Sequence, residues 1–265
     1  MLIATDLDGT LVPHGADTVS PYTADVLRRV DALGIPVVFV TARPLRWMDG
    51  LWPFVGEHGL AIVSNGAVTY DVTARRILSL DGFPPSEGLA LVDVIRAALP
   101  ESTFAIECAD GIRLDPDFDD PIPPPPGSPR GPLAAVWDSP AVKVLVRHRE
   151  ADHDALHDAV MTAVGDRGVA TWSVPGLVEI SPAGVTKASA LAALCAARGV
   201  PAAEVVAFGD MPNDIPMLAW AGTSYAMAGA HGSVLDVADH VAPPAEEDGV
   251  ARVLEALLLG HGTVG

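Results

Sequence analysis

The sequence predicts an α/β protein with a Rossmann-like, three-layer core, a mostly parallel sheet and an inserted α+β domain. Short β-branched runs alternate with amphipathic segments at the start of the chain, and the same alternation returns after Thr186. Between them lies a stretch of about a hundred residues that instead contains paired strand signals and a proline tract. Continuous apolar runs are typical of parallel strands that are covered on both faces.

The first segment supplies the opening strands and helices of the core. Ser20 is a suitable helix N-cap, Pro21 suits the first helical position, and Gly34 suits the end. We expect strands at 2–5, 37–40 and 60–64, helices at 21–33 and 44–52, and a hairpin from 67–70 with 76–80.

The inserted stretch begins after the linker 82–85, and its sequence predicts a helix followed by antiparallel strands. Ser86 is the expected cap of its first helix. The proline run 123–126 excludes a central strand or helix, so we expect an extended surface loop over 115–132. The remaining predictions are helices at 86–99 and 151–164, and strands at 103–108, 111–114, 141–146, 169–173 and 178–180.

An alanine-rich helix over 186–198, ending at Gly199, returns the chain to the core, and a strand over 205–208 follows. The alternation continues through 213–221, 223–227, 233–238 and 249–259. We therefore place the core at residues 1–81 and 182–265 and the inserted domain at 82–181.

The composition narrows the classes of partner. The chain of 265 residues is 49% apolar and 19% charged, which is enough to bury a core, and its formal net charge is −18. So acidic a surface repels nucleic acid and anionic membranes. The sequence has neither a signal-peptide pattern nor an apolar run of membrane-spanning length, so we expect a cytoplasmic protein, monomeric by default, with a weak homodimer left open.

Two carboxylates, Asp6 and Asp8, directly follow the first predicted strand. Acidic side chains at the end of a buried strand are costly unless a cation compensates them. Oxygen-only ligands favour Mg²⁺ over zinc. Gly9, which precedes Thr10, allows a sharp turn close to a ligand.

Three further candidate motifs lie at the ends of predicted strands or at the start of a predicted helix. Thr41 follows the second strand, and its hydroxyl could hold a phosphoryl oxygen. Lys187 begins the alanine-rich helix and could neutralise phosphate and carboxylates together. The segment 209–214 ends another strand. In an open parallel sheet, ligands collect at the carboxyl ends of the strands, so Asp6, Thr41 and Asp210 should meet there.

These motifs resemble the haloacid dehalogenase (HAD) superfamily. The resemblance covers the whole chain and rests on Asp6-x-Asp8-Gly9-Thr10, Thr41, Lys187 and Gly209-Asp210-x-x-Asn213-Asp214 in this order. The late lysine, the segment Asn65-Gly66-Ala67 and the insertion resemble the Cof-type branch (subfamily IIB), which carries an α/β C2-type cap and is related to sucrose-phosphate and mannosyl-3-phosphoglycerate phosphatases.

The resemblance implies a Mg²⁺-dependent phosphomonoesterase with defined roles. Asp6 would attack phosphorus, and Asp8 would protonate the leaving group and then activate water. Metal ligands would be Asp6, the carbonyl of Asp8 and Asp210, with Asn213 and Asp214 orienting ligands or water. Thr41 and Lys187 would hold the phosphoryl group. Candidates for substrate binding are Gly9, Thr10, Ala42, Arg43, Asn65 and Gly66; the family usually has Gly where Ala42 stands.

Family analogy favours a sugar phosphate only weakly, and the inserted domain would set specificity. A phosphotransferase or phosphomutase on the same scaffold and a non-catalytic sensor of a phosphorylated metabolite stay open as alternatives. A dinucleotide-binding protein is disfavoured, because the first strand is not followed by a Gly-x-Gly-x-x-Gly turn.

Overall fold

The computed structural model describes residues 1–119, 122–148, 152–174 and 176–260. The chain forms two compact units. The core unit comprises Met1–Arg43, Trp47–Ser79 and Thr186–Gly265, and the inserted unit comprises Pro44–Arg46 and Leu80–Val185. The domain limits 1–81, 182–265 and 82–181 stay a prediction from the sequence.

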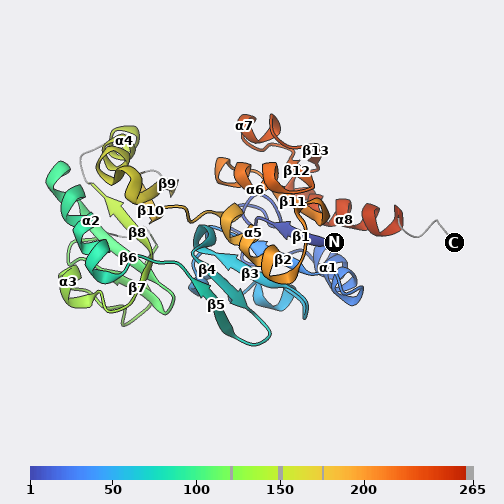
Figure 1. Cartoon of the computed structure of the whole chain (residues 1–265), viewed down its shortest axis with the longest axis horizontal. Coiled ribbons are helices and arrows are strands. Elements are labelled where there is room, and N and C mark those ends of the chain that lie inside the picture. Colours follow the sequence, from blue (N-terminus) through green and yellow to red (C-terminus); the bar gives the residue numbers. More distant parts are fainter. Residues whose placement is uncertain (120–121, 149–151, 175, 261–265) are drawn as a thin grey trace. The chain divides into compact units, whose positions relative to one another are not determined.

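The core sheet has eight strands in the order β13-β12-β11-β1-β2-β3-β4-β5 (Figure 1). The six strands from β13 to β3 are parallel, and β4 runs antiparallel to β3. Strand β1 therefore lies between β11 and β2, the position that gathers side chains from three strand ends. The bounds are β1 Leu2–Thr5, β2 Val37–Val40, β3 Leu60–Val63, β4 Val68–Asp71, β5 Arg76–Leu80, β11 Val205–Gly209, β12 Thr223–Met227 and β13 His240–Ala242.

Helices cover both faces of the core sheet because each central strand is apolar on both sides. Leu2 and Ala4 of β1 share one buried cluster with Leu191 of α5. The intervening Ile3 points to the other face, where it lies beside α1 and α8. The core helices are α1 Pro21–Ala32, α5 Lys187–Arg198, α6 Ile215–Trp220, α7 Gly232–Leu235 and α8 Gly249–Gly260. No helix within the described ranges combines the length and apolar character needed to cross a membrane.

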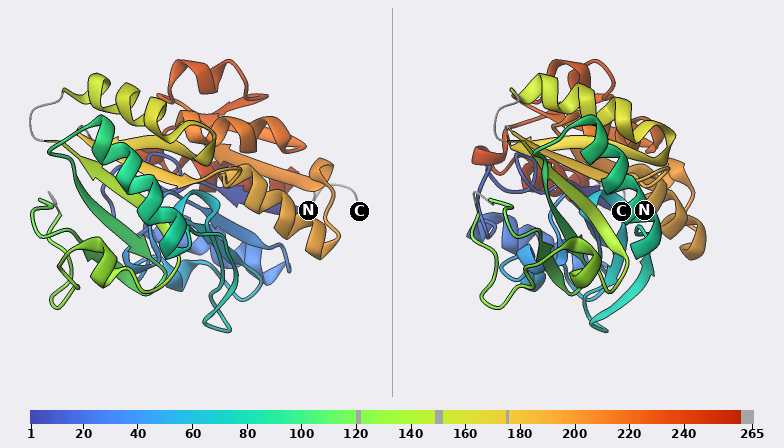
Figure 2. Two further views of the ribbon diagram at one scale, coloured as in Figure 1. Left: turned by 60° about the vertical axis from the view of Figure 1, so that its left-hand side comes forward. Right: turned by 90° about the vertical axis from the view of Figure 1, so that its left-hand side faces the viewer.

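The inserted unit is a five-stranded antiparallel sheet in the order β7-β6-β8-β10-β9. Helices α2 and α4 cover one face of it (Figure 2) and share its buried cluster. The elements are α2 Pro85–Ala98, β6 Thr103–Cys108, β7 Gly111–Leu114, α3 Leu133–Val136, β8 Ala141–Arg147, α4 His153–Val164, β9 Gly168–Val174 and β10 Leu177–Pro182. The predicted fold class, a parallel α/β core with an inserted α+β domain, is confirmed.

Two local predictions are wrong. Residues 44–52 do not form one helix but contribute to two short 3₁₀ turns, η1 Leu45–Trp47 and η2 Trp52–Phe54. Gly50 disfavours a continuous helix, and Met48 and Leu51 are instead buried as anchors of the loop. Helix α2 begins at Pro85 with Pro84 in the cap position, so Ser86 lies inside the helix.

The proline-rich segment agrees with the prediction of irregular structure. Between β7 and α3, the described residues form neither a helix nor a strand. Phe118 is buried there, and the Arg130 guanidinium donates to three backbone carbonyls, of Asp115, Pro116 and Phe118. The remaining short turns are η3 Ser64–Gly66, η4 Gly165–Arg167, η5 Ala202–Glu204, η6 Pro212–Asp214 and η7 Ala245–Glu247.

Candidate active site

Three neighbouring parallel strands end at the same edge of the core sheet, and each is followed by a candidate site residue. Thr5 of β1 lies opposite Phe208 of β11 and Phe39 of β2. Asp6, Asp210 and Thr41 therefore emerge at one level, and all three are buried. Parallel strands must place their carboxyl ends together, so this convergence follows from topology.

Lys187 enters this edge from the first turn of α5. Its side chain is 1% exposed, and Nζ donates to Oδ1 of Asp6 at 2.6 Å and to Oδ1 of Asp214 at 2.7 Å. The preceding Thr186 caps the helix: its hydroxyl accepts from the Ser189 N–H, and the Ser189 hydroxyl accepts from the Thr186 N–H. The cap thus fixes the start of the helix and the direction of Lys187.

Burial alone would lower the pKa of Lys187, but the carboxylates of Asp214 and Asp6 outweigh it and raise the pKa above its ordinary value. The lysine is therefore a permanent cation at neutral pH. A cation in the first turn of a helix is disfavoured by the helix dipole, so these carboxylates are what stabilise it there.

Asp214 is fully buried, and both of its oxygens are already engaged. Oδ1 accepts from Lys187, while Oδ2 accepts from the backbone N–H groups of Asp210 and Met211 at 3.1 and 3.0 Å. This side chain holds the lysine and the turn after β11 in place, which suits an orienting residue better than a direct metal ligand.

The carboxylates of Asp6, Asp210 and Asp214 offer oxygens that all lie within 4.8 Å of one another. Lys187 is hydrogen-bonded to two of them, and three ionised carboxylates with this one ammonium group sum to two net negative charges. Burial, reinforced by Asp214, raises the pKa of Asp6 well above its usual range, and burial likewise raises the pKa of Asp210. A group of hard carboxylate oxygens whose negative charge exceeds that of the one lysine fits a divalent cation such as Mg²⁺.

Asp210 is oriented by Thr10, whose hydroxyl donates to Oδ1 at 2.8 Å. The backbone at Gly9, the residue before Thr10, passes very close to the Asp210 side chain, and its φ is +79°. A Cβ at this position would lie 2.4 Å from Oδ2 of Asp210. Gly9 and Thr10, predicted as substrate-binding residues, are thus positioned to shape the carboxylate site.

Arg43 is buried and bound to Asp8. Its Nε donates to Oδ2 of Asp8 at 2.8 Å, and its Nη2 donates to Oδ1 at 2.6 Å and to the carbonyl of Ala16 at 2.7 Å. The Asp8 side chain is 36% exposed, so it can still reach a ligand. The structure shows the Arg43 guanidinium bound to Asp8, and the substrate contact suggested by the sequence stays a prediction.

Thr41 accepts a hydrogen bond at its Oγ1 from the N–H of Arg43 at 3.0 Å. No acceptor for its hydroxyl proton is found among the described residues, so this proton is available to an anionic oxygen. Ala42, between these two residues, is partly buried. The methyl group that replaces the usual glycine is accommodated.

Asn65 and Gly66 lie beside this group in the turn η3. The Asn65 N–H donates to the Thr41 carbonyl at 3.0 Å, and its Oδ1 accepts from Nδ2 of Asn213 at 3.1 Å. Gly66 has φ of +106°, and a Cβ there would lie 2.3 Å from the carbonyl oxygen of Thr186. This glycine lets η3 pack against the start of α5, next to Lys187.

His14 was missed by sequence reasoning. Its Nε2 lies 3.8 Å from Oδ2 of Asp210, its ring packs against Gly9, and its side chain is 69% exposed. The only signal in the sequence is its place in the loop that follows Thr10, which does not distinguish it from its neighbours.

Comparisons with known proteins agree with this geometry. Residues 3–254 match the family model of the haloacid dehalogenase-like hydrolases. The chain is 29% identical to 5-amino-6-(5-phospho-D-ribitylamino)uracil phosphatase YitU of Bacillus subtilis, covering 96% of each chain. It is 27% identical to pyridoxal phosphate phosphatase YbhA of Escherichia coli, covering 97% of this chain and 98% of the relative.

Solved structures share the fold across both units. A haloacid dehalogenase-like hydrolase from Bacteroides thetaiotaomicron superimposes with a TM-score of 0.80 at 22% identity, covering 97% of this chain and 98% of that one. The HAD subclass IIB sugar phosphatase BT4131 gives a TM-score of 0.78 at 18% identity with the same coverage. At these identities the likeness shows the fold alone.

The family match spans nearly the whole chain and confirms the resemblance drawn from the motifs. This chain therefore belongs to the haloacid dehalogenase-like hydrolases.

Proposed function

We propose that this protein is a Mg²⁺-dependent phosphomonoester hydrolase that works through an aspartyl-phosphate on Asp6. One observation carries the proposal: Lys187 holds one carboxylate oxygen of Asp6, Asp210 lies beside it, and Asp8 follows two residues later. No hydrogen bond within the described residues occupies Oδ2 of Asp6, which leaves this oxygen available as the nucleophile.

Asp6, Asp210 and the backbone carbonyl of Asp8 are the proposed ligands of Mg²⁺. When bound, the ion would neutralise the carboxylates and the phosphoryl oxygens, so that an anionic nucleophile can approach an anionic phosphorus centre. Asp214 would keep the turn after β11 in register through its bonds to the backbone of Asp210 and Met211.

The residues divide the reaction into two displacements. In the first, a carboxylate oxygen of Asp6 forms a bond to phosphorus, the bond from phosphorus to the ester oxygen breaks, and Asp8 gives its proton to the leaving alcohol. In the second, Asp8 takes a proton from water as that water attacks phosphorus, and the bond to Asp6 breaks to release phosphate. Thr41 and Lys187 would bind the phosphoryl oxygens in both steps.

The proposed substrate is a small phosphorylated metabolite, with sugar phosphates as the first class to test. The named relatives act on a ribitylaminouracil phosphate and on pyridoxal phosphate, so family membership alone does not select the alcohol. Selection would belong to the inserted domain. We further propose a monomeric, cytoplasmic enzyme without nucleic-acid or membrane partners, as the net charge of −18 favours.

The test is phosphate release from a panel of phosphorylated metabolites with Mg²⁺, using Asp6→Asn as the control. Release by the wild type but not by the variant is expected. A phosphotransferase would instead pass the phosphoryl group to an added sugar acceptor and would release no inorganic phosphate. A sensor would bind panel members without turnover, and equal release by Asp6→Asn would refute the proposal.

A further inference from the structure

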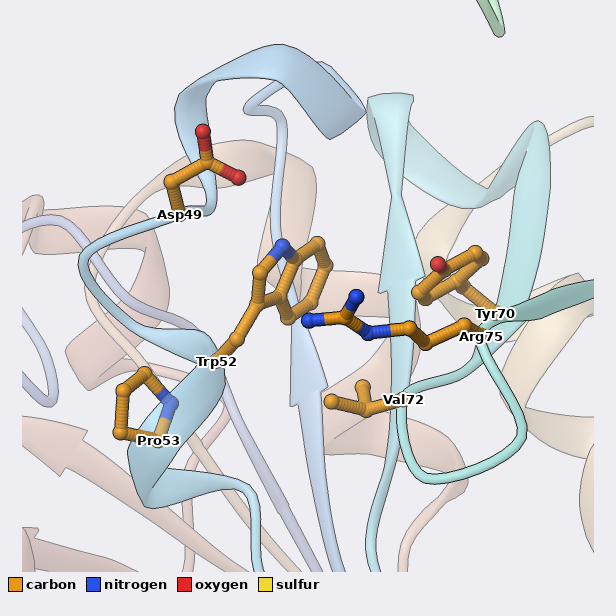
Figure 3. Close-up of a pocket in the computed structure, with 6 residues that line it drawn as sticks. All are labelled: Asp49, Trp52, Pro53, Tyr70, Val72 and Arg75. Atoms are coloured by element: carbon orange, nitrogen blue, oxygen red, sulfur yellow. The ribbon is translucent and has the colours of Figure 1, made fainter.

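A cavity lies in the core unit, away from the strand ends that hold Asp6. Its volume is about 490 Å³, within the range of small-molecule sites. One wall comes from the loop around η2 and the other from the β4–β5 hairpin (Figure 3). The lining residues are Asp49, Trp52, Pro53, Tyr70, Val72 and Arg75.

The register of the sheet separates this cavity from the active-site edge. Tyr70 pairs with Ala61, near the amino-terminal end of β3. Val72 and Arg75 lie farther along the hairpin, still away from the carboxyl end where Thr41 is found. The chemistry at Asp6 therefore does not explain this cavity.

An aromatic surface forms the centre of the cavity. The rings of Trp52 and Tyr70 lie 5.4 Å apart between centroids with an interplanar angle of 33°. The backbone N–H of Trp52 donates to the Met48 carbonyl at 3.0 Å, and the preceding Leu51 is fully buried. Both features fix the position of Trp52. The rings touch each other, so a planar ligand would stack on a free face rather than slide between them.

Arg75 supplies a cation without a carboxylate partner in the described part of the chain. Its neighbour Arg76 faces Asp71 at 3.9 Å, and Asp71 also accepts from the Ala74 N–H at 2.8 Å. Arg75 instead has φ of +50° and points its guanidinium toward the Trp52 indole (Figure 3). A non-glycine residue in the left-handed region is uncommon. At Arg75 this backbone conformation directs the side chain toward the aromatic surface (Figure 3).

An arginine with no carboxylate partner among the described residues is unusual in a chain with only 16 Lys and Arg against 34 Asp and Glu. The overall field repels anions, so an anionic ligand here depends on the local guanidinium, which matches phosphate geometry through two parallel hydrogen bonds. Asp49 also lines the cavity, and its negative charge would keep an anionic group at the Arg75 end. The volume exceeds what a single aromatic ring requires and leaves room for a ring, a linker and a phosphate.

We propose that this cavity is a nucleoside monophosphate site, with the base stacked on Trp52 and the phosphate paired with Arg75. Every nucleobase has a π-face, so stacking accepts all four bases, with purines favoured by their larger area. The site lies outside the catalytic group, so it is independent of the proposed phosphatase activity.

The test is calorimetric titration of the full chain with AMP, GMP, CMP and UMP in EDTA, which removes Mg²⁺ from the catalytic edge. Saturable binding is expected, unchanged in Asp6→Asn and weak for adenosine and ribose 5-phosphate, which each lack one recognised group. Binding of no mononucleotide in the millimolar range overturns the proposal, as does equal binding of ribose 5-phosphate and AMP.

Matched variants locate the site. Arg75→Gln should weaken AMP binding by roughly 10-fold or more, while Arg76→Gln, one residue along the same hairpin, should not. Trp52→Leu should weaken it by roughly 5- to 100-fold, and Trp47→Leu should leave it unchanged. Since Arg75 is exposed, its variant should fold even if Trp52→Leu does not. Equal affinity of Arg75→Gln and Arg76→Gln would refute the assignment.

Discussion

Arg43 donates from Nε and Nη2 to the two carboxylate oxygens of Asp8, at 2.8 and 2.6 Å. A bidentate pair fixes both the position and the rotation of a carboxylate. The proposed acid and base is therefore oriented by a buried side chain that is itself anchored to the Ala16 carbonyl. We therefore propose that Arg43 would act on the reaction through Asp8, as a positioning residue.

Replacing Arg43 with lysine keeps the charge but removes the planar fork. We expect kcat to fall roughly 100-fold with KM changed much less, because a displaced Asp8 affects proton transfer more than binding. Steady-state kinetics measure this split. Arg28→Lys, at an exposed position, is the control, and a loss confined to KM would show that Arg43 binds substrate directly.

Asp8→Asn should separate binding from turnover. An amide neither donates a proton to the leaving alcohol nor accepts one from water, so turnover should fall by about 10²- to 10⁴-fold. Affinity for a phosphate mimic with Mg²⁺, measured by calorimetry, should stay close to that of the wild type. Turnover at the wild-type rate would remove Asp8 from the mechanism.

Lys187→Met should destabilise the fold, because it leaves Asp6 and Asp214 buried without their cation. Breaking a buried ion pair from one side typically costs about 3–5 kcal/mol. Denaturant unfolding at neutral pH measures the loss. Adding Asp214→Asn to this variant should recover part of it, and a double variant no more stable than the single one would argue against the ion pair.

Alkaline pH should weaken the same contact. The folded pKa of Lys187 is raised above the ordinary value of 10.5, so its stabilisation is complete below that pH and is lost as pH rises past it. The stability difference between wild type and Lys187→Met should therefore be constant at neutral pH and shrink above about pH 10.5. A difference that grows with pH would contradict the assigned direction.

Mg²⁺ should stabilise the folded protein. At about 100 times its Kd, a ligand specific for the native state adds about 2.7 kcal/mol, visible as a higher Tm. Asp210→Asn should abolish the response because it removes a proposed ligand at the strand ends, whereas Asp236→Asn, on the exposed surface, should retain it. An equal Tm shift in both variants would place the ion elsewhere.

Much of the fold and part of the site follow from local sequence. The apolar runs ending in Asp6, Thr41 and Asp210 predict parallel strands, and parallel strands bring their ends together. Thr186 before the alanine-rich segment is a local cap signal that gives the start of α5. Such features depend on neighbours in the chain, so a single sequence contains them.

The features that sequence reasoning missed depend on contacts between distant segments. Arg43 and Asp8 are 35 residues apart, and only the folded chain shows that one orients the other. His14 reaches Asp210 across the turn at Gly9. The sequence of residues 44–52 predicts a helix, but the structure has 3₁₀ turns there, with Met48 and Leu51 buried in the core. Tertiary packing overrides local propensity there.

The most direct measurement of the central claim is mass spectrometry of the peptide containing Asp6 after rapid acid quench of the enzyme turning over a good substrate with Mg²⁺. We expect a phosphoryl group on Asp6 in the wild type, with neither the modification nor turnover in Asp6→Asn. Steady turnover with an unmodified Asp6 peptide at every quench time, together with an active Asp6→Asn variant, would contradict it.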